Sequence, residues 1–169
     1  ATVESYAELE GDDFVVIGGY ESGVDAAYHL ARRGKAVRLI DRECPWESES
    51  SDPSVALSTY SLERMRDRRF REHVELHPMT TITGVQPSDQ GFQIETESGL
   101  TFMTEEQPLL ASGFDGSHKL IPDLFEKRED GFPLLNENDE STIVPGLFLC
   151  GASVGRKRRG CCVICKSRQ

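Results

Sequence analysis

Hydrophobic and polar positions follow one another in distinct blocks through the first quarter of the chain. Residues 14–17 form a short apolar run rich in β-branched side chains, which predicts a buried parallel strand. Over residues 24–33, apolar side chains recur at spacings of three and four, as one face of an amphipathic helix requires. A second apolar run at residues 36–40 predicts another buried strand. This order predicts a βαβ unit and therefore an α/β fold.

The pattern changes after this unit. Residues 61–73 are highly charged with a narrow apolar stripe and predict a helix, and residues 74–77 predict a short strand. Period-two alternation with tight turns then predicts an antiparallel β-meander. Its three strands are expected at residues 80–86, 92–97 and 100–104. Two later apolar runs, at residues 107–112 and 143–151, predict two more strands.

A glycine-rich turn lies between the first strand and the first helix. It consists of Gly18, Gly19, Tyr20, Glu21, Ser22 and Gly23. In dinucleotide-binding βαβ units the first glycine makes the tight turn, and a later one lets the helix pack closely on the sheet. Free N–H groups at the helix start then face a diphosphate, whose negative charge the helix dipole favours. The turn therefore predicts a dinucleotide site, with an ordinary βαβ unit that binds no ligand as the alternative.

Tyr20 departs from the G-x-G-x-x-G pattern, whose middle glycine would stand at this position. A side chain there limits how closely the backbone approaches the diphosphate. The flanking elements nevertheless keep the expected order, because Asp41 ends the second strand 18 residues after Gly23. A carboxylate at this point accepts hydrogen bonds from a ribose diol. The context therefore favours a dinucleotide site in spite of Tyr20.

Asp41 and Arg42 bear on which nicotinamide dinucleotide is bound. The carboxylate suits the ribose of NAD and repels a 2′-phosphate, whereas the guanidinium group of Arg42 would neutralise that phosphate. Taken alone, these two residues favour NAD.

Composition excludes several classes of protein. The chain has 169 residues, a net charge of −10 and 37% hydrophobic residues, and it lacks the basic balance that a nucleic-acid partner requires. No apolar run approaches the roughly 20 residues of a membrane span. The polar, acidic N-terminus shows no signal peptide. These features predict a cytoplasmic protein with neither a nucleic-acid nor a membrane partner.

The five cysteines make an odd number, which argues against a secreted disulfide framework and for a reducing compartment. Cys161, Cys162 and Cys165 lie close together in the sequence. Cys162 and Cys165 have the spacing of a redox pair, but inert buried thiols are the commoner alternative. A metal site would need a fourth ligand, and no nearby histidine supplies one. We therefore predict no metal site and assign no catalytic residue.

Three stretches of the sequence together resemble a known family. They are Val16-Ile17-Gly18-Gly19-Tyr20-Glu21-Ser22-Gly23-Val24-Asp25-Ala26-Ala27, Leu109-Leu110-Ala111-Ser112-Gly113 and Pro145-Gly146-Leu147-Phe148-Leu149-Cys150-Gly151. With the βαβ unit and the meander, they look like the two-dinucleotide-binding-domain flavoproteins, and most like the thioredoxin-reductase-like branch that includes bacillithiol-disulfide reductases. A residue other than glycine typically precedes the Glu-Ser pair in that branch, so the resemblance makes Tyr20 a family variation.

The resemblance implies a domain organisation in which an NAD(P)-binding domain is inserted into an FAD-binding domain. We expect a linker at residues 1–11, the NAD(P)-binding domain at 12–118 and a connecting loop at 119–143. Residues 144–169 would be the return strand and helix of a partial FAD-binding domain. The family's first FAD-binding βαβ unit should precede residue 1, so the chain is expected to be a fragment. The expected fold is a Rossmann-like parallel sheet with an antiparallel β-meander, plus this return segment.

The resemblance also implies further cofactor-binding residues. Asp25 falls where relatives carry an acid near the nicotinamide and flavin, although an acid in the first helical turn also favours the helix dipole. Ser112 and Gly113 match the strand end that passes the cofactor, with a plain strand-to-turn junction as the alternative. Gly151 stands where relatives contact FAD, and Ala152 replaces the Asp that often follows it.

The resemblance implies an enzyme that depends on FAD and NAD(P). The intact protein would pass hydride from NAD(P)H to FAD and on to a disulfide or similar acceptor. The fragment alone is expected to be inactive, because it lacks most of the FAD site. Members of the family often use NADPH, so the cofactor prediction is NAD(P). Expected partners are the rest of the FAD domain and a second copy in a homodimer. The alternative is a non-catalytic, regulatory NAD(P)-binding module.

Overall fold

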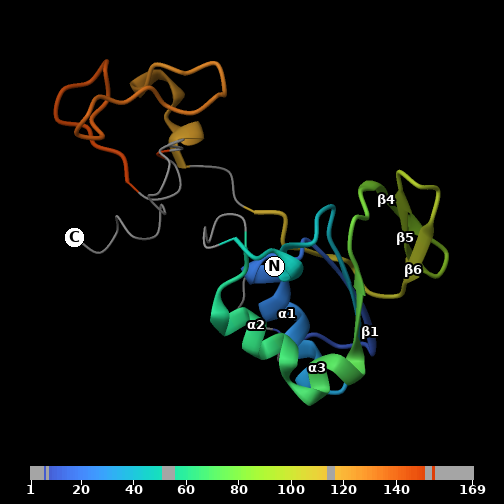
Figure 1. Cartoon of the computed structure of the whole chain (residues 1–169). Helices are drawn as coiled ribbons and strands as arrows, with labels where there is room; N and C mark the ends of the chain where they lie inside the picture. The colour runs from blue at the N-terminus through green and yellow to red at the C-terminus, as the bar shows by residue number, and fades with distance from the viewer. Residues whose placement is uncertain (1–5, 7, 51–55, 114–116, 151–153, 155–169) are drawn as a thin grey trace. The chain divides into compact units, whose positions relative to one another are not determined.

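The computed structural model divides into two compact units, Ala1–Gly113 (unit 1) and Phe114–Gln169 (unit 2) (Figure 1). Each unit is described by itself. The described residues are 6, 8–50, 56–113, 117–150 and 154.

A four-stranded parallel sheet forms the centre of unit 1. Its order is β3-β2-β1-β7, and every neighbouring pair runs parallel. The strands are β1 (Asp13–Ile17), β2 (Ala36–Ile40), β3 (Val74–His77) and β7 (Leu109–Leu110). The helices are α1 (Glu21–Arg32), α2 (Thr59–Arg66) and α3 (Arg68–His73). The predicted βαβ unit is therefore confirmed as β1, α1 and β2.

A separate antiparallel sheet follows in the sequence and confirms the predicted meander. Its order is β4-β5-β6. The strands are β4 (Ile82–Ser88), β5 (Gly91–Thr96) and β6 (Thr101–Thr104). Ile94 of β5 is paired with Phe102 of β6, and both side chains are buried. The expected α/β fold with a parallel and an antiparallel sheet is thus correct.

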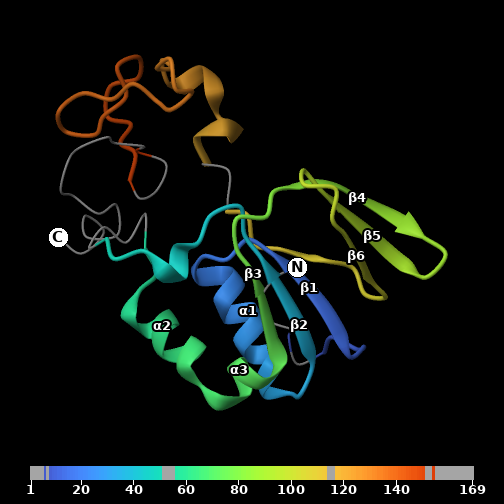
Figure 2. The same ribbon diagram turned by 45° about the vertical axis from the view of Figure 1, so that its right-hand side comes forward.

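The two faces of the parallel sheet carry different layers, because successive side chains of a strand point to opposite sides. Phe14 and Val16 of β1 belong to the hydrophobic cluster that includes helix α1. Val15, which lies between them in the sequence, packs instead with Ile94 and Phe102 of the meander. Figure 2 shows the helices on one side of the sheet and the meander on the other.

The first helix begins earlier than its apolar pattern predicts. It starts at Glu21, three residues before the expected start at Val24. The predicted helix over residues 61–73 is in fact two helices, separated at Asp67, whose ψ of 140° is extended. The Asp67 carboxylate accepts a hydrogen bond of 2.8 Å from the N–H of Arg69. Asp67 therefore caps α3, which explains why a polar residue breaks an otherwise helical pattern.

The strand predicted over residues 107–112 is much shorter in the structure. Strand β7 contains only Leu109 and Leu110, which are in register with Val16 and Ile17 of β1, and the Leu110 side chain is 72% exposed. β7 lies at the edge of the parallel sheet, and among the described residues no strand pairs with its other side. The apolar run therefore overstated both the length and the burial of this strand.

Unit 2 contains two short 3-10 helices, Ser117–Leu120 and Pro122–Leu124, and isolated β-bridges. The strand predicted over residues 143–151 is wrong for its described part, residues 143–150, which contains a turn and one bridge at Phe148. The reason is local pairing of its backbone, because Leu149 N–H donates to the Asp139 carbonyl at 2.9 Å. The predicted helix that follows lies outside the described residues.

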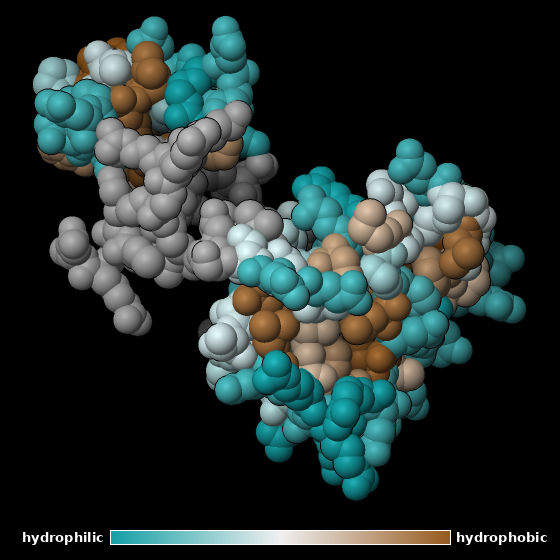
Figure 3. Space-filling view, in the orientation of Figure 1, coloured by the Kyte–Doolittle hydropathy of each residue, from teal (hydrophilic) through white to brown (hydrophobic). Residues whose placement is uncertain are grey.

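The helices α2 and α3 present a hydrophilic surface. Their sequences, TYSLERMR and RRFREH, are dominated by charged residues, and Figure 3 shows hydrophilic residues over this part of unit 1. Phe70 is the buried apolar contact of α3. No helix among the described residues is both long and apolar enough to cross a membrane.

We expect the substitution Gly23→Ala to destabilise unit 1 strongly. A Cβ atom at Gly23 would lie 1.7 Å from the Gly18 carbonyl oxygen, which is backbone and has little room to move. Relief of this clash would push α1 away from the sheet and cost about 3 kcal/mol of unfolding free energy. Urea denaturation followed by circular dichroism measures the loss.

The matched control is Gly84→Ala in strand β4. An added Cβ atom there would meet its nearest neighbour, Glu95 Oε2, at 3.7 Å, so its unfolding free energy should change by no more than about 0.5 kcal/mol. Equal denaturation midpoints for the two variants would contradict the role assigned to Gly23.

Candidate functional site

The glycine turn lies where the strands β1, β2 and β7 end, at the carboxyl edge of the parallel sheet. Gly18 has a φ of +107°, a conformation that favours glycine. Its N–H donates to the Ile40 carbonyl at 2.8 Å. A Cβ atom on Gly18 would lie 2.4 Å from the Ala111 carbonyl oxygen and 3.1 Å from Ser112 N. The fold therefore brings the turn against the end of β7, as parallel strand order requires.

Helix α1 starts directly from this turn. Its N-cap residue is Tyr20, which makes no side-chain capping hydrogen bond. The first N–H groups of a helix have no partner within the helix, and here they belong to Glu21, Ser22 and Gly23. An uncapped helix N-terminus at the end of a parallel strand is a suitable place for an anionic group.

The Tyr20 side chain extends to Glu43, two residues beyond Asp41 in the sequence. Its Oη donates to Glu43 Oε2 at 3.2 Å. Burial, and then the hydrogen bond and negative charge of Glu43, raise the pKa of Tyr20 above its usual value. The ring is also packed against the main hydrophobic cluster. The residue that breaks the glycine pattern is thus held by residues at the end of β2.

Asp41 joins the glycine turn to the end of β2. Its Oδ2 atom accepts a 2.5 Å hydrogen bond from Gly19 N–H, and its Oδ1 atom accepts one of 2.7 Å from Glu43 N–H. The residue is only 7% exposed. Arg42 differs, because its side chain is 78% exposed and its Nε atom lies 3.9 Å from Glu43 Oε1. The predicted pair Asp41 and Arg42 therefore flanks the turn. The Asp41 carboxylate is buried against the turn, and the Arg42 guanidinium group is exposed to solvent.

Trp46 is the residue of this site that sequence reasoning missed. It lies in a 3-10 helix, Pro45–Glu47, shortly after β2. A Cβ atom on Gly19 would be 2.4 Å from Trp46 Cζ3 and 2.9 Å from Asp41 Cβ. The missing side chain of Gly19 therefore makes room for the indole ring and for Asp41. The available signal was a lone tryptophan in the loop that follows the predicted ribose-binding strand.

The side chain of Glu21 points to helix α2. Its carboxylate accepts hydrogen bonds from Ser58 N–H, from Ser58 Oγ and from Ser61 Oγ. Burial alone would raise the pKa of Glu21, but these hydrogen bonds and the charge of Arg64 outweigh it and hold the pKa below its usual value. Glu21 therefore ties the N-terminus of α1 to that of α2 through its carboxylate.

Asp25 lies in the second turn of α1, because the helix begins at Glu21. This corrects the alternative that it is a first-turn acid. Its carboxylate forms an ion pair with Arg64, and its Oδ1 atom lies 3.6 Å from His29 Nε2. In this structure the acid predicted to approach the nicotinamide is held against helix α2.

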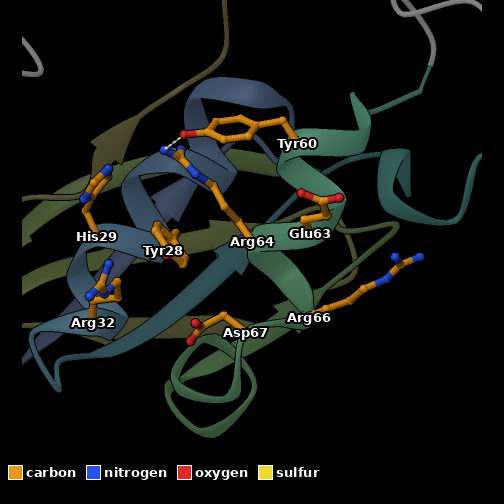
Figure 4. Close-up of a pocket in the computed structure, with 8 residues that line it drawn as sticks. All are labelled: Tyr28, His29, Arg32, Tyr60, Glu63, Arg64, Arg66 and Asp67. Atoms are coloured by element: carbon orange, nitrogen blue, oxygen red, sulfur yellow. Dashed lines mark hydrogen bonds between the residues drawn. The ribbon is translucent and has the colours of Figure 1, made fainter.

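Arg64 is central to a cleft of about 530 Å³ that lies along α1 and α2 (Figure 4). Its guanidinium group lies 4.9 Å from the ring centre of Tyr28 and 4.3 Å from that of Tyr60. It also donates to Tyr60 Oη at 2.7 Å. The remaining lining residues are His29, Arg32, Glu63, Arg66 and Asp67. Arg64 thus joins the two helices through aromatic and ionic contacts.

Ser112 is exposed and Gly113 has a φ of +95°. Ala111 N–H donates to the Ile17 carbonyl at 2.8 Å, which extends the pairing of β7 with β1 up to the glycine turn. Gly151 and the cysteines at positions 161, 162 and 165 lie outside the described residues. Within the described part of the chain, no group of three or more His, Cys, Asp or Glu side chains is arranged to hold a metal ion.

Comparison with known proteins supplies a family. Residues 1–151 match the family described as pyridine nucleotide-disulphide oxidoreductase. The chain is 30% identical over 106 residues to the tRNA 5-methylaminomethyl-2-thiouridine biosynthesis bifunctional protein MnmC of Psychrobacter sp. (strain PRwf-1). This match covers 52% of this chain and 14% of that protein. It is also 25% identical over 151 residues to the bifunctional thioredoxin reductase/thioredoxin of Mycobacterium leprae (strain TN). This second match covers 89% of this chain and 31% of that protein.

A solved structure shares the fold. It is an engineered water-forming NADPH oxidase bound to NADPH, a mutant of the NADH oxidase from Lactobacillus brevis. The TM-score is 0.61 at 20% identity, over 84% of this chain and 30% of the oxidase. The chain therefore spans less than a third of the length of each of these three proteins.

We expect the substitution Glu21→Gln to lower the unfolding free energy near neutral pH but not in acid. A carboxyl group whose folded pKa lies below the unfolded value of 4.5 stabilises the fold above that value and loses this contribution as the pH falls through the folded pKa. Near neutral pH the variant should lose about 1 kcal/mol of unfolding free energy, because Gln cannot provide charge-assisted hydrogen bonds to the two serines. Once the pH has fallen below the folded pKa of Glu21, the two proteins should converge.

Urea midpoints measured across the acidic range make this comparison. Glu63→Gln is the matched control, since Glu63 is an exposed residue of α2 and its replacement should change the unfolding free energy by no more than about 0.5 kcal/mol. A constant difference between wild type and Glu21→Gln at every pH would show that the Glu21 carboxylate does not act through its charge.

Proposed function

Because this chain belongs to the pyridine nucleotide-disulphide oxidoreductase family, we propose that unit 1 binds NAD(P)H within a larger flavin-dependent oxidoreductase. The observation that carries the proposal is the uncapped N-terminus of α1, which starts at the glycine turn beside Asp41 and the end of β7. The parts expected of a dinucleotide site thus lie at one edge of one sheet.

The diphosphate is proposed to bind at the start of α1. Gly18 turns the backbone sharply, so that the N–H groups of Ser22 and Gly23 follow directly after β1. Ser22 is exposed and adds a small hydroxyl group at the same point. The helix dipole and these donors together favour two negative phosphate groups. Because the Tyr20 hydroxyl group is bound to Glu43, these N–H groups are proposed to be the main contacts of the diphosphate.

The adenosine ribose is proposed to lie at Asp41. Each carboxylate oxygen accepts one backbone N–H in this structure, and an ionised carboxylate has about four acceptor positions. Asp41 therefore keeps capacity for a ribose hydroxyl group while it positions the turn. Arg42 has an exposed guanidinium group next to it, which suits a 2′-phosphate. This arrangement serves both NADH and NADPH, and the proposed cofactor is NAD(P).

The redox part of the function rests on the family. Bound NAD(P)H and FAD would supply hydride transfer, and a disulfide or a similar group is the proposed acceptor. The name of the mycobacterial relative, a thioredoxin reductase fused to thioredoxin, supports a disulfide acceptor, and the oxidase bound to NADPH supports the nucleotide. Gly151, proposed to contact FAD, lies outside the described residues. The domain boundaries, the homodimer, the cytoplasmic location and the roles of Asp25, Ser112 and Gly113 stay predictions.

A non-catalytic NAD(P)-binding module is the second candidate function. It is favoured by one observation, namely that unit 1 has its own hydrophobic core, built from β1, β2, α1 and their neighbours. Both candidates require the same nucleotide site. They differ in whether the bound NAD(P)H is oxidised, so flavin reduction measured in the full-length protein separates them.

We expect the substitution Ser22→Asp to weaken dinucleotide binding without loss of stability. A carboxylate in the first turn of α1 favours the helix dipole, so the melting temperature should stay the same or rise slightly. The same charge repels the diphosphate, and the affinity for NADH and NADPH should fall about tenfold or more. Calorimetric titration of the 169-residue chain with each nucleotide measures the affinity.

Gln90→Glu is the matched control, because it adds the same charge at an exposed position in the turn between β4 and β5. It should bind both nucleotides like the wild type. If Ser22→Asp binds as tightly as this control, the diphosphate does not lie at the start of α1. If the wild-type chain binds neither nucleotide, the proposed site is wrong.

A further inference from the structure

We infer that Trp46 forms the aromatic wall on which the adenine ring of the bound dinucleotide stacks. This inference rests on the proposed function and adds a positioning residue that the glycine motif does not contain. Three features of the structure carry it: the place of the indole ring, the way in which its segment is anchored, and the chemistry of the neighbouring groups.

The indole ring lies beside the group proposed to hold the adenosine ribose. An added Cβ atom on Gly19 would meet Trp46 Cζ3 at 2.4 Å and Asp41 Cβ at 2.9 Å. The ring and the carboxylate therefore lie next to each other on the same glycine. Adenine is bonded directly to the ribose, so a ribose held at Asp41 brings the base within reach of the ring.

The segment that carries Trp46 is held in place on both sides of the ring. On one side, Glu43 is bound by Asp41 and by Tyr20. On the other, Glu47 N–H donates to the Cys44 carbonyl at 3.1 Å and closes the 3-10 turn. Pro45 is buried and fixes the backbone next to the tryptophan. A ring that is already positioned loses little conformational entropy when a ligand binds.

The burial of Trp46 is partial, which leaves indole surface available to a ligand. The side chain packs against the hydrophobic cluster around α1, yet it is not among the fully buried residues. Tryptophan presents a large aromatic surface, and stacking on such a surface is favourable for a neutral, planar base. The nicotinamide end of the dinucleotide is separated from this point by the diphosphate and the second ribose. The ring that stacks on Trp46 is therefore adenine and not nicotinamide.

Fluorescence tests this inference directly, because Trp46 is the single tryptophan of the chain. The probes are ADP-ribose, which contains the adenosine half without nicotinamide, and nicotinamide mononucleotide, which contains the other half. We expect ADP-ribose to change the tryptophan emission in a saturable way and nicotinamide mononucleotide to leave it unchanged. Calorimetry with NADH and NADPH on the same sample establishes whether the dinucleotide site exists.

Two variants add a test that does not depend on fluorescence. Trp46→Phe keeps an aromatic face, whereas Trp46→Leu keeps apolar bulk and removes the aromatic face. The affinity of Trp46→Leu for ADP-ribose should fall about tenfold, and that of Trp46→Phe should fall less. Melting curves of both variants show whether they fold, and the wild-type fluorescence result stands if Trp46→Leu does not.

The outcomes separate the inference from the proposed function. If NADH or NADPH binds but ADP-ribose leaves the emission unchanged, the dinucleotide site stands and the role of Trp46 is wrong. The same conclusion follows if folded Trp46→Leu binds ADP-ribose as tightly as the wild type, or more tightly, since the ring would then only cover the turn. Failure of the wild type to bind any of the nucleotides overturns both proposals.

Discussion

The close approach of Gly18 and Gly23 is the constraint on which the arrangement of unit 1 depends. A Cβ atom on Gly23 would lie 1.7 Å from the Gly18 carbonyl oxygen, so α1 can leave β1 at this angle only if position 23 lacks a side chain. This contact places the start of α1 at the edge where β1, β2 and β7 end. The uncapped N–H groups of the helix consequently lie close to the buried Asp41 carboxylate, which accepts the Gly19 N–H group of the same turn.

Residues from the end of β2 to the start of α2 enclose this helix start. Asp41 holds the Gly19 N–H group, Trp46 covers Gly19, and Ser58 with Ser61 binds Glu21. Each of these contacts satisfies a polar group or covers an apolar one near the proposed binding surface, which lowers the cost of keeping that surface ordered. Further along the two helices, Arg64 of α2 binds Asp25 of α1 and packs against the rings of Tyr28 and Tyr60.

The two units differ in what holds them together. Unit 1 has two hydrophobic clusters on the two faces of its parallel sheet, whereas the described residues of unit 2 are connected by 3-10 turns and isolated bridges. Nucleotide binding is therefore proposed for a unit with a core of its own. Oxidoreductase activity is proposed only for a larger protein that contains unit 1, because the chain spans 14% and 31% of the length of the two curated relatives.

The sequence by itself determined the fold class, the βαβ unit, the meander and the glycine turn next to Asp41, because each depends on local periodicity or on glycine at fixed positions. Only the tertiary structure decided which partners the polar side chains found. The family resemblance predicted Asp25 near the cofactor, and no local pattern singled out Trp46. In the structure, helix α2 instead binds Asp25 through Arg64, and Gly19 leaves the space that Trp46 occupies. Likewise, the apolar run at residues 143–151 predicted a strand, but a strand needs a neighbouring strand to pair with. In its described part the backbone is paired instead with residues near Asp139, and such a choice between pairing partners is not encoded in the run itself.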